Sequence, residues 1–216
     1  MKKELNLDLY LVTDRDLSLG RPIDEIVNAA AKGGATLVQL REKKCSTREF
    51  VEIANKLLEI LRPKEIPLLI NDRLDVALAV KADGVHIGQS DMPYEIAREM
   101  LGPEAIIGLS VESVEDAIEA EKLDVDYIGL SPIFSTPTKT DTKHELGLEG
   151  IKKIKKISGH KLVGIGGMNS SNAERVIAAG ADGIAVVSAI CSAESPEKAS
   201  RELREIVVST KRGLQR

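Results

Sequence analysis

The feature that most constrains the fold is an alternation, repeated eight times, of a short aliphatic run with a more polar connecting segment. The runs are rich in Val, Ile and Leu and are bounded by Gly, Asp or Ser, which is typical of strands buried on both faces. The predicted strands are Leu9–Thr13, Thr36–Arg41, Pro67–Ile70, Gly84–Ile87, Ile106–Ser110, Tyr127–Ser131, Leu162–Ile165 and Gly183–Val187. Amphipathic segments predict helices at Asp24–Ala31, Glu49–Leu61, Val114–Lys122, Asn172–Ala179 and Glu197–Val208.

This alternation predicts an α/β fold with a parallel sheet and right-handed crossovers. Eight units in 216 residues favour a single (β/α)8 TIM barrel over an open sheet, with the active site at the C-terminal ends of the strands. No linker or change of composition divides the chain, so we expect one domain over residues 1–216. Ser46 or Thr47 is a predicted helix N-cap, and Gly33 and Gly180 are predicted C-caps.

Composition excludes several classes of function. A net charge of −4 weighs against a nucleic-acid binder with a broad basic face, and 2% aromatic residues weigh against base stacking. No apolar run approaches the roughly 20 residues that span a bilayer. Asp8 and Asp14 interrupt the N-terminal apolar stretch, so we expect no signal peptide. Cys45 and Cys191 form no disulfide framework, which predicts a reducing, cytoplasmic location.

Polar residues follow the second predicted strand. Gln39, Arg41 and Lys43 share one face because side chains alternate along a strand. Two cations facing the mouth of a barrel are costly to bury unless an anion meets them, so this face predicts an anionic ligand. The alternative is an Arg–Glu pair that caps the barrel.

Two aspartates follow the third and fourth predicted strands. Asn71 and Asp72 end one strand, and Asp91 comes shortly after the next, so the two carboxylates are expected to meet. Such a pair suits a hard cation such as Mg²⁺, held partly by protein and partly by phosphate oxygens. The alternative is that each aspartate caps the helix that follows it.

The later strand ends carry hydroxyl and glycine residues. Ser135 to His144 form a segment without periodicity, which predicts a lid or binding loop or, alternatively, a plain surface loop. Gly167 follows the seventh strand and Ser188 the eighth, which is where barrels frequently bind a phosphate.

No acid–base pair or nucleophile stands out. His86 is interpreted as a hydrogen-bonding residue of the barrel interior, whereas His144 and His160 have no clear partner in the sequence. Cys45 and Cys191 are expected to be inert. The sequence thus predicts a cationic site after the second to fourth strands and a phosphate site after the seventh and eighth, but no catalytic base. This combination fits a reaction in which the diphosphate of one substrate leaves with the help of a metal and cations. The second substrate would be held by its phosphate.

The motifs together resemble the thiamine-phosphate synthase family over nearly the whole chain. The matching segments are YLVTD (Tyr10–Asp14), QLREK (Gln39–Lys43), INDR (Ile70–Arg73), DGVHIGQSD (Asp83–Asp91), GLSPIFSTPTK (Gly129–Lys139), GIGG (Gly164–Gly167) and AVVSAI (Ala185–Ile190). The resemblance implies an enzyme that condenses 4-amino-2-methyl-5-hydroxymethylpyrimidine diphosphate with thiazole phosphate, or its carboxylated form, to thiamine phosphate and pyrophosphate. The implied reaction is dissociative and uses Mg²⁺.

The resemblance also implies roles for individual residues. It assigns Gln39, Arg41, Lys43, Asn71, Ser110 and Lys139 to the pyrimidine diphosphate, with Arg41, Lys43, Ser110 and Lys139 as the catalytic set. It assigns Thr136, Thr138, Gly167, Val187 and Ser188 to the thiazole phosphate, and Asp72 and Asp91 to the metal. Small-molecule substrates are therefore the expected partners, with neither nucleic acid nor membrane, and the chain is a candidate homo-oligomer.

Three departures from the family pattern affect loops: Ser131 precedes Pro132, Ser135 stands where a Pro is common, and Glu112 stands where relatives often have His. The nearest competing function is the thiazole tautomerase of the same superfamily, against which Glu112 and the retained diphosphate residues argue. A phosphate-binding isomerase or lyase barrel is a second competing function, but it leaves the aspartate pair unused. A catalytically silent binding barrel is a third.

Overall fold

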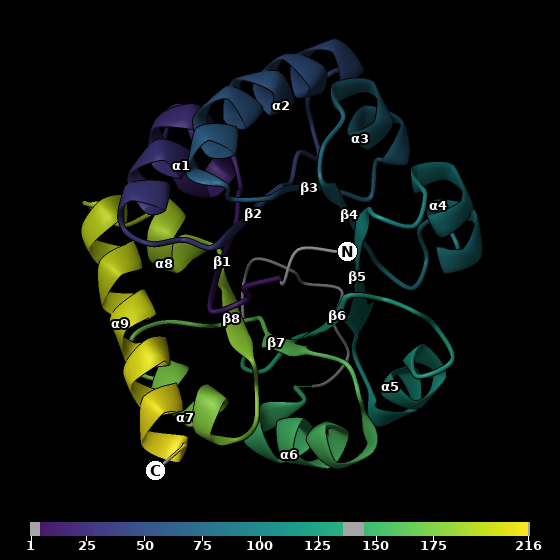
Figure 1. Ribbon diagram of the computed structural model, residues 1–216. Coiled ribbons are helices and arrows are strands. Elements are labelled where there is room, and N and C mark those ends of the chain that lie inside the picture. Colours follow the sequence, from purple (N-terminus) through teal and green to yellow (C-terminus); the bar gives the residue numbers. More distant parts are fainter. Residues whose placement is uncertain (1–4, 136–144, 216) are drawn as a thin grey trace.

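Eight parallel strands form a closed barrel in the computed structural model, which describes residues 5–135 and 145–215 (Figure 1). The strands are β1 (Leu9–Val12), β2 (Leu37–Leu40), β3 (Leu68–Asn71), β4 (Gly84–Ile87), β5 (Ile106–Val111), β6 (Tyr127–Leu130), β7 (Leu162–Gly164) and β8 (Gly183–Val186). Each strand pairs with the next along the chain, and β8 pairs back with β1. The predicted (β/α)8 TIM barrel is confirmed, because an open sheet would lack the pairing of β1 with β8.

Helices surround the strands as an outer ring (Figure 1). They are α1 (Ile23–Lys32), α2 (Thr47–Leu61), α3 (Leu74–Val80), α4 (Tyr94–Leu101), α5 (Val114–Ala120), α6 (Gly147–Ile157), α7 (Ala173–Ala178), α8 (Ser188–Cys191) and α9 (Pro196–Leu214). Short 3-10 turns occur at Asp16–Ser18 and Arg62–Lys64. All five helices predicted from amphipathic segments are present, whereas α3, α4, α6 and α8 were not predicted. None of the described helices is both long and apolar enough to cross a membrane.

The helix caps follow the sequence closely. Ser46 is the N-cap of α2, and its hydroxyl accepts a hydrogen bond from the backbone N–H of Glu49 at 3.2 Å. Gly33 is the C-cap of α1, as predicted. The prediction for Gly180 is wrong by one residue, because Ala179 is the C-cap of α7. Gly180 follows it with a φ of 114°, since the left-handed residue stands just after the cap.

The strands separate two apolar cores. Leu9 and Leu11 of β1 point outward into the large core between strands and helices, whereas Tyr10 and Val12 point into the smaller core inside the barrel. The same alternation on β2 places Leu37 inside. Side chains two residues further along each strand therefore also face the interior, nearer the C-terminal end, which is where the polar residues of the sequence motifs lie.

Candidate functional site

A cavity of about 760 Å³ opens at the C-terminal ends of the strands. Side chains or backbone from all eight strands contribute to its lining. Its size is within the roughly 300–1,000 Å³ that is typical of small-molecule sites. In barrels of this architecture the active site lies at this face, so the cavity is the candidate active site.

The structure brings the predicted site residues together. Within residues 5–135 and 145–215, all of them line this one cavity: Gln39, Arg41, Lys43, Asn71, Asp72, Asp91, Ser110, Gly167, Val187 and Ser188. Thr136, Thr138 and Lys139 lie outside the described residues, as does His144. Their proposed roles remain predictions.

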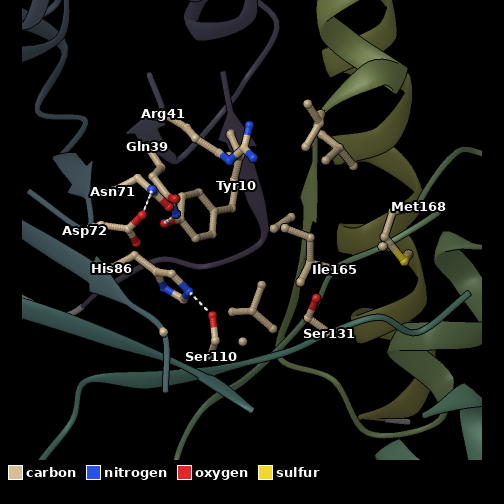
Figure 2. Close-up of a pocket in the computed structure, with 18 of the residues that line it drawn as sticks. Tyr10, Gln39, Arg41, Asn71, Asp72, His86, Ser110, Ser131, Ile165 and Met168 are labelled. Carbon is tan, nitrogen blue, oxygen red and sulfur yellow. Dashed lines mark hydrogen bonds between the residues drawn. The ribbon is translucent and has the colours of Figure 1, made fainter. Parts of the chain in front are cut away.

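Arg41 extends into the cavity from the end of β2 (Figure 2). Its Nη1 donates to Oδ2 of Asp14, which follows β1, at 2.8 Å. The neighbouring Glu42 is buried and pairs with Arg15 at 3.0 Å between Oε2 and Nε. Arg41 therefore pairs with Asp14 rather than with Glu42, and the Arg–Glu pair present here is Arg15–Glu42.

The aspartates form a compact acidic group with Lys43. Oδ2 of Asp72 accepts hydrogen bonds from Lys43 Nζ and from Asn71 Nδ2, each at 2.6 Å. Asp72 adopts a φ of 60°, a left-handed conformation that Asp tolerates better than most residues. Asp91 is held by its own loop, since its Oδ2 accepts the backbone N–H of Gly88 at 2.7 Å.

The pKa of the Asp91 carboxyl is raised above its ordinary value. Burial is the largest cause; the Gly88 N–H lowers this pKa, and the adjacent Asp72 carboxylate raises it through a hydrogen bond and through its charge. Asp72 and Asp91 line the same cavity, and the Asp72 carboxylate is close enough to raise the Asp91 pKa, as expected if the two carboxyl groups meet. The alternative that they cap helices is wrong, because the N-caps of α3 and α4 are Arg73 and Pro93, neither with a side-chain cap bond.

The donor set at this pair fits Mg²⁺. Two half-buried carboxylates that repel each other would be relieved by a cation between them. No group of three or more His, Cys, Asp or Glu residues suited to a metal occurs among the residues that the structure describes. Mg²⁺ commonly takes only one or two carboxylates, with water and substrate phosphates completing its shell. Asp72 and Asp91 are thus adequate ligands for an ion that binds together with a phosphorylated substrate.

The opposite wall of the cavity is built by the loops after β7 and β8. Gly166 and Gly167 have φ values of 98° and 65°. A Cβ on Gly167 would lie 2.8 Å from the carbonyl oxygen of Ser135, so only glycine allows this close approach to the loop after β6. Figure 2 shows Ile165 and Met168 across the cavity from His86 and Asp72. The cavity therefore has one charged wall and one largely neutral wall.

Sequence reasoning missed the two tyrosines inside the barrel. Tyr10 and Tyr127 are fully buried, and their hydroxyl oxygens lie 2.8 Å apart. His86 contacts Tyr127 and Ser110, which confirms it as a hydrogen-bonding interior residue. A usable signal was present, because two of the chain's three tyrosines lie in predicted strands of an otherwise aliphatic core. Buried tyrosine hydroxyls need partners.

Burial raises the pKa of both cysteine thiols, in line with the expectation that they are inert. It raises the pKa of Cys191 to about 11 and also raises the pKa of Cys45, so both favour the protonated thiol. The expectation that His160 lacks a partner is wrong. Its Nε2 lies 3.0 Å from the carbonyl oxygen of Ala120, a contact formed across the gap between α5 and β7 that the sequence does not reveal.

Comparisons with known proteins agree with this geometry. The family model for thiamine monophosphate synthase matches residues 9–190. A thiamine-phosphate synthase of Albidiferax ferrireducens is 53% identical over 93% of this chain and 92% of its own length. One of Leptospira biflexa is 54% identical over 91% of this chain and 95% of its own. The solved thiamine phosphate pyrophosphorylase of Pyrococcus furiosus is 46% identical, with a TM-score of 0.88 over 95% of this chain and 98% of its own. The chain belongs to the thiamine monophosphate synthase family.

Proposed function

We propose that this chain is a transferase that joins a pyrimidine diphosphate to a thiazole phosphate and releases pyrophosphate, forming thiamine phosphate. The observation that carries the proposal is the two-walled cavity. Arg41, Lys43 and the Asp72–Asp91 pair gather on one wall, and Gly167 stands on the other. Two phosphorylated ligands can then lie side by side with their reacting atoms between the walls.

The charged wall is assigned to the pyrimidine diphosphate. Arg41 and Lys43 supply two positive charges where the negative charge of a leaving diphosphate grows, and ion pairs with Asp14 and Asp72 hold both cations at the mouth. Asn71 adds an amide beside them. Such fixed charges stabilise the transition state because they need no reorganisation during the reaction. The resemblance to the family assigns Lys139 to the diphosphate and Thr136 and Thr138 to the thiazole phosphate, and all three lie outside the described residues.

Asp72 and Asp91 are the residues that would hold Mg²⁺. When bound there, the ion supplies positive charge that neutralises the diphosphate and makes it a better leaving group. Lys43 Nζ lies 2.6 Å from Asp72 Oδ2, so the lysine screens this carboxylate and is itself directed toward the same anion. Two cationic side chains, Arg41 and Lys43, thus line the same cavity as the proposed metal ligands.

The bond changes need no protein base. The carbon–oxygen bond to the diphosphate breaks with its electron pair on the leaving oxygen, and the lone pair of the thiazole nitrogen forms the new carbon–nitrogen bond. Both ring nitrogens of His86 are within hydrogen-bonding distance of hydroxyls, 2.8 Å from Tyr127 and 2.9 Å from Ser110. We therefore assign the chain's contribution to binding, orientation and charge. Gly167, Val187 and Ser188 are assigned to the thiazole phosphate.

The deciding assay gives the purified chain both precursors with Mg²⁺ and measures pyrophosphate and thiamine phosphate. We expect equal amounts of the two products. Isomerisation of the carboxylated thiazole alone, without pyrophosphate release, would instead support the tautomerase. Turnover of neither substrate combination would reject the assignment. A cytoplasmic location and a homo-oligomeric state stay predictions.

A second test addresses the acidic pair. Asp91→Asn keeps an oxygen that can accept the Gly88 N–H bond but removes the carboxylate charge. We expect kcat/KM to fall at least about 100-fold, with the Mg²⁺ concentration for half-maximal rate raised. Glu119→Gln on the outer helix α5, where Glu119 forms an exposed ion pair with Lys122, is the matched acid-to-amide control. Equal Mg²⁺ dependence in Asp91→Asn and the control would contradict the metal assignment.

A further inference from the structure

A continuous series of hydrogen bonds crosses the barrel interior through residues that line the cavity, and Figure 2 labels four of its five residues. Gln39 Nε2 donates to the Tyr10 hydroxyl. The Tyr10 and Tyr127 hydroxyls are 2.8 Å apart, Tyr127 Oη is 2.8 Å from His86 Nδ1, and His86 Nε2 is 2.9 Å from Ser110 Oγ. The series therefore links Gln39 and Ser110, two residues assigned to the pyrimidine diphosphate.

The direction of the protons follows from the end of the series at Gln39. An amide nitrogen can only donate, so the Tyr10 oxygen accepts from it and its own proton points to Tyr127. Tyr127 in turn donates to Nδ1 of His86. Burial raises the pKa of both phenols, so each hydroxyl retains the proton that it donates.

The same reasoning determines the state of His86. With Nδ1 accepting, the neutral ring carries its proton on Nε2 and donates it to the oxygen of Ser110. An imidazolium would have to donate from Nδ1 to Tyr127, which would turn the Tyr127 proton back toward Tyr10. The buried Tyr10 proton would then lose its acceptor, and an unpaired buried donor is costly. Neutral His86 with Nε2–H is the arrangement in which every proton in the series has an acceptor.

We propose that Tyr127 and His86 are positioning residues that make Ser110 a hydrogen-bond donor toward the cavity, directed at an acceptor atom of the pyrimidine diphosphate. The inference rests on the proposed function for the identity of that ligand. Because the Ser110 oxygen accepts from His86, its own proton is directed elsewhere, and Ser110 lines the cavity. The serine thus recognises a ring nitrogen or an anionic oxygen, and discriminates against a donor group at that position.

Two glycines reserve the space for this series. A Cβ on Gly108 would lie 2.1 Å from Cζ of Tyr127, and one on Gly129 would lie 3.2 Å from Cε1 of His86. Glycine inside a strand usually marks such a close approach. Gly108 in β5 and Gly129 in β6 therefore leave the room that the Tyr127 ring and the His86 imidazole occupy.

The first test reads the tautomer of His86 directly, and it needs no substrate. Two-bond ¹H–¹⁵N correlation spectra of the full chain labelled at histidine, with His86→Gln used for assignment, distinguish protonated from bare ring nitrogens. We expect a single neutral tautomer with Nε2–H. A proton on Nδ1, or an imidazolium at neutral pH, would overturn the proposal.

The second test removes one hydroxyl. Tyr127→Phe keeps the ring that packs edge-on against Tyr10, and Tyr94→Phe, whose hydroxyl bonds the Asp124 carbonyl on the outer surface, is the matched control. We expect kcat/KM for the pyrimidine diphosphate to fall about 3- to 10-fold, as the loss of one hydrogen bond predicts, while KM for the thiazole phosphate is unchanged. A merely structural lesion would change both.

The third test compares the activities of two substitutions at His86. His86→Gln can still donate an amide N–H toward Ser110, whereas His86→Leu cannot, so the glutamine variant should retain more activity. Equal activity of the two variants, or a Tyr127→Phe enzyme that matches the control, would overturn the positioning role. If the wild-type chain forms no thiamine phosphate, the proposed function fails, while the spectra still decide the tautomer.

Discussion

Replacing Gly108 with alanine tests the packing on which the barrel interior depends. Gly108 lies in β5, and the added methyl would meet the Tyr127 ring at 2.1 Å from Cζ, 2.3 Å from the hydroxyl oxygen and 2.5 Å from Cε1. Ordinary contact for a Cβ begins at about 3.4 Å, so the ring must move by about 1 Å or more. Tyr127 is fully buried, and its ring packs edge-on against Tyr10, whose ring centroid lies 5.8 Å away.

The magnitude follows from two consequences of that displacement. Overpacking of a tight core costs about 1–3 kcal/mol of unfolding free energy. For a chain of this size each kcal/mol lowers the Tm by about 2–4 °C, which gives a decrease of about 2–12 °C. A 1 Å shift would also distort the 2.8 Å hydrogen bonds from the Tyr127 hydroxyl to Tyr10 and His86. Activity should therefore fall together with stability.

The assay is thermal unfolding followed by circular dichroism, with kcat/KM measured well below the Tm. Gly213→Ala in α9 is the matched control, because a Cβ there has no neighbour within 4 Å. The same substitution at a helix position without strain leaves the Tm unchanged or slightly higher, since alanine restricts the unfolded chain. A Gly108→Ala protein with the Tm and kcat/KM of the wild type would refute the packing argument.

Two further predictions concern stability. The pKa of Cys191 rises from 9.0 to about 11 on folding, so above pH 9 the unfolded state holds fewer protons than the folded state and stability falls as pH rises toward 11. The difference in unfolding free energy between wild type and Cys191→Ala, from urea titrations, should therefore shrink by about 2 kcal/mol between pH 8 and pH 10.5; a constant difference would contradict it. Ser46→Ala removes the N-cap of α2 and should lower the Tm by about 2–4 °C, corresponding to about 1 kcal/mol, whereas an unchanged Tm would show that the cap contributes nothing.

The barrel fold and most of the residues at its C-terminal face could be predicted because the sequence patterns that indicate them are local. Each strand is buried on both faces and reads as a continuous aliphatic run, and eight such runs leave few possible folds. Polar residues at the strand ends must meet at one face once the strands are parallel, so Arg41, Asp72 and Asp91 were placed correctly. The unpredicted helix α8 is only 4 residues long, too short for a clear helical period.

The interior hydrogen bonds were not predictable for a different reason. Tyr10 and Tyr127 are 117 residues apart, and their strands β1 and β6 are not neighbours in the sheet. Which inward side chains face each other depends on the stagger between strands around the whole barrel, and no local pattern records it. The partner of Arg41 was missed similarly, because Asp14 reaches it from the adjacent strand rather than from its own.

The buried pair of Tyr10 and Tyr127 inside the barrel bears on how ligands reach and leave the site. Other side chains of the same interior core, Leu37, Leu69 and Val163, are also essentially inaccessible to solvent. Among the described residues, the cavity at the C-terminal ends of the strands is therefore the route by which a ligand enters and leaves the barrel. Both substrates and both products of the proposed reaction therefore share this opening.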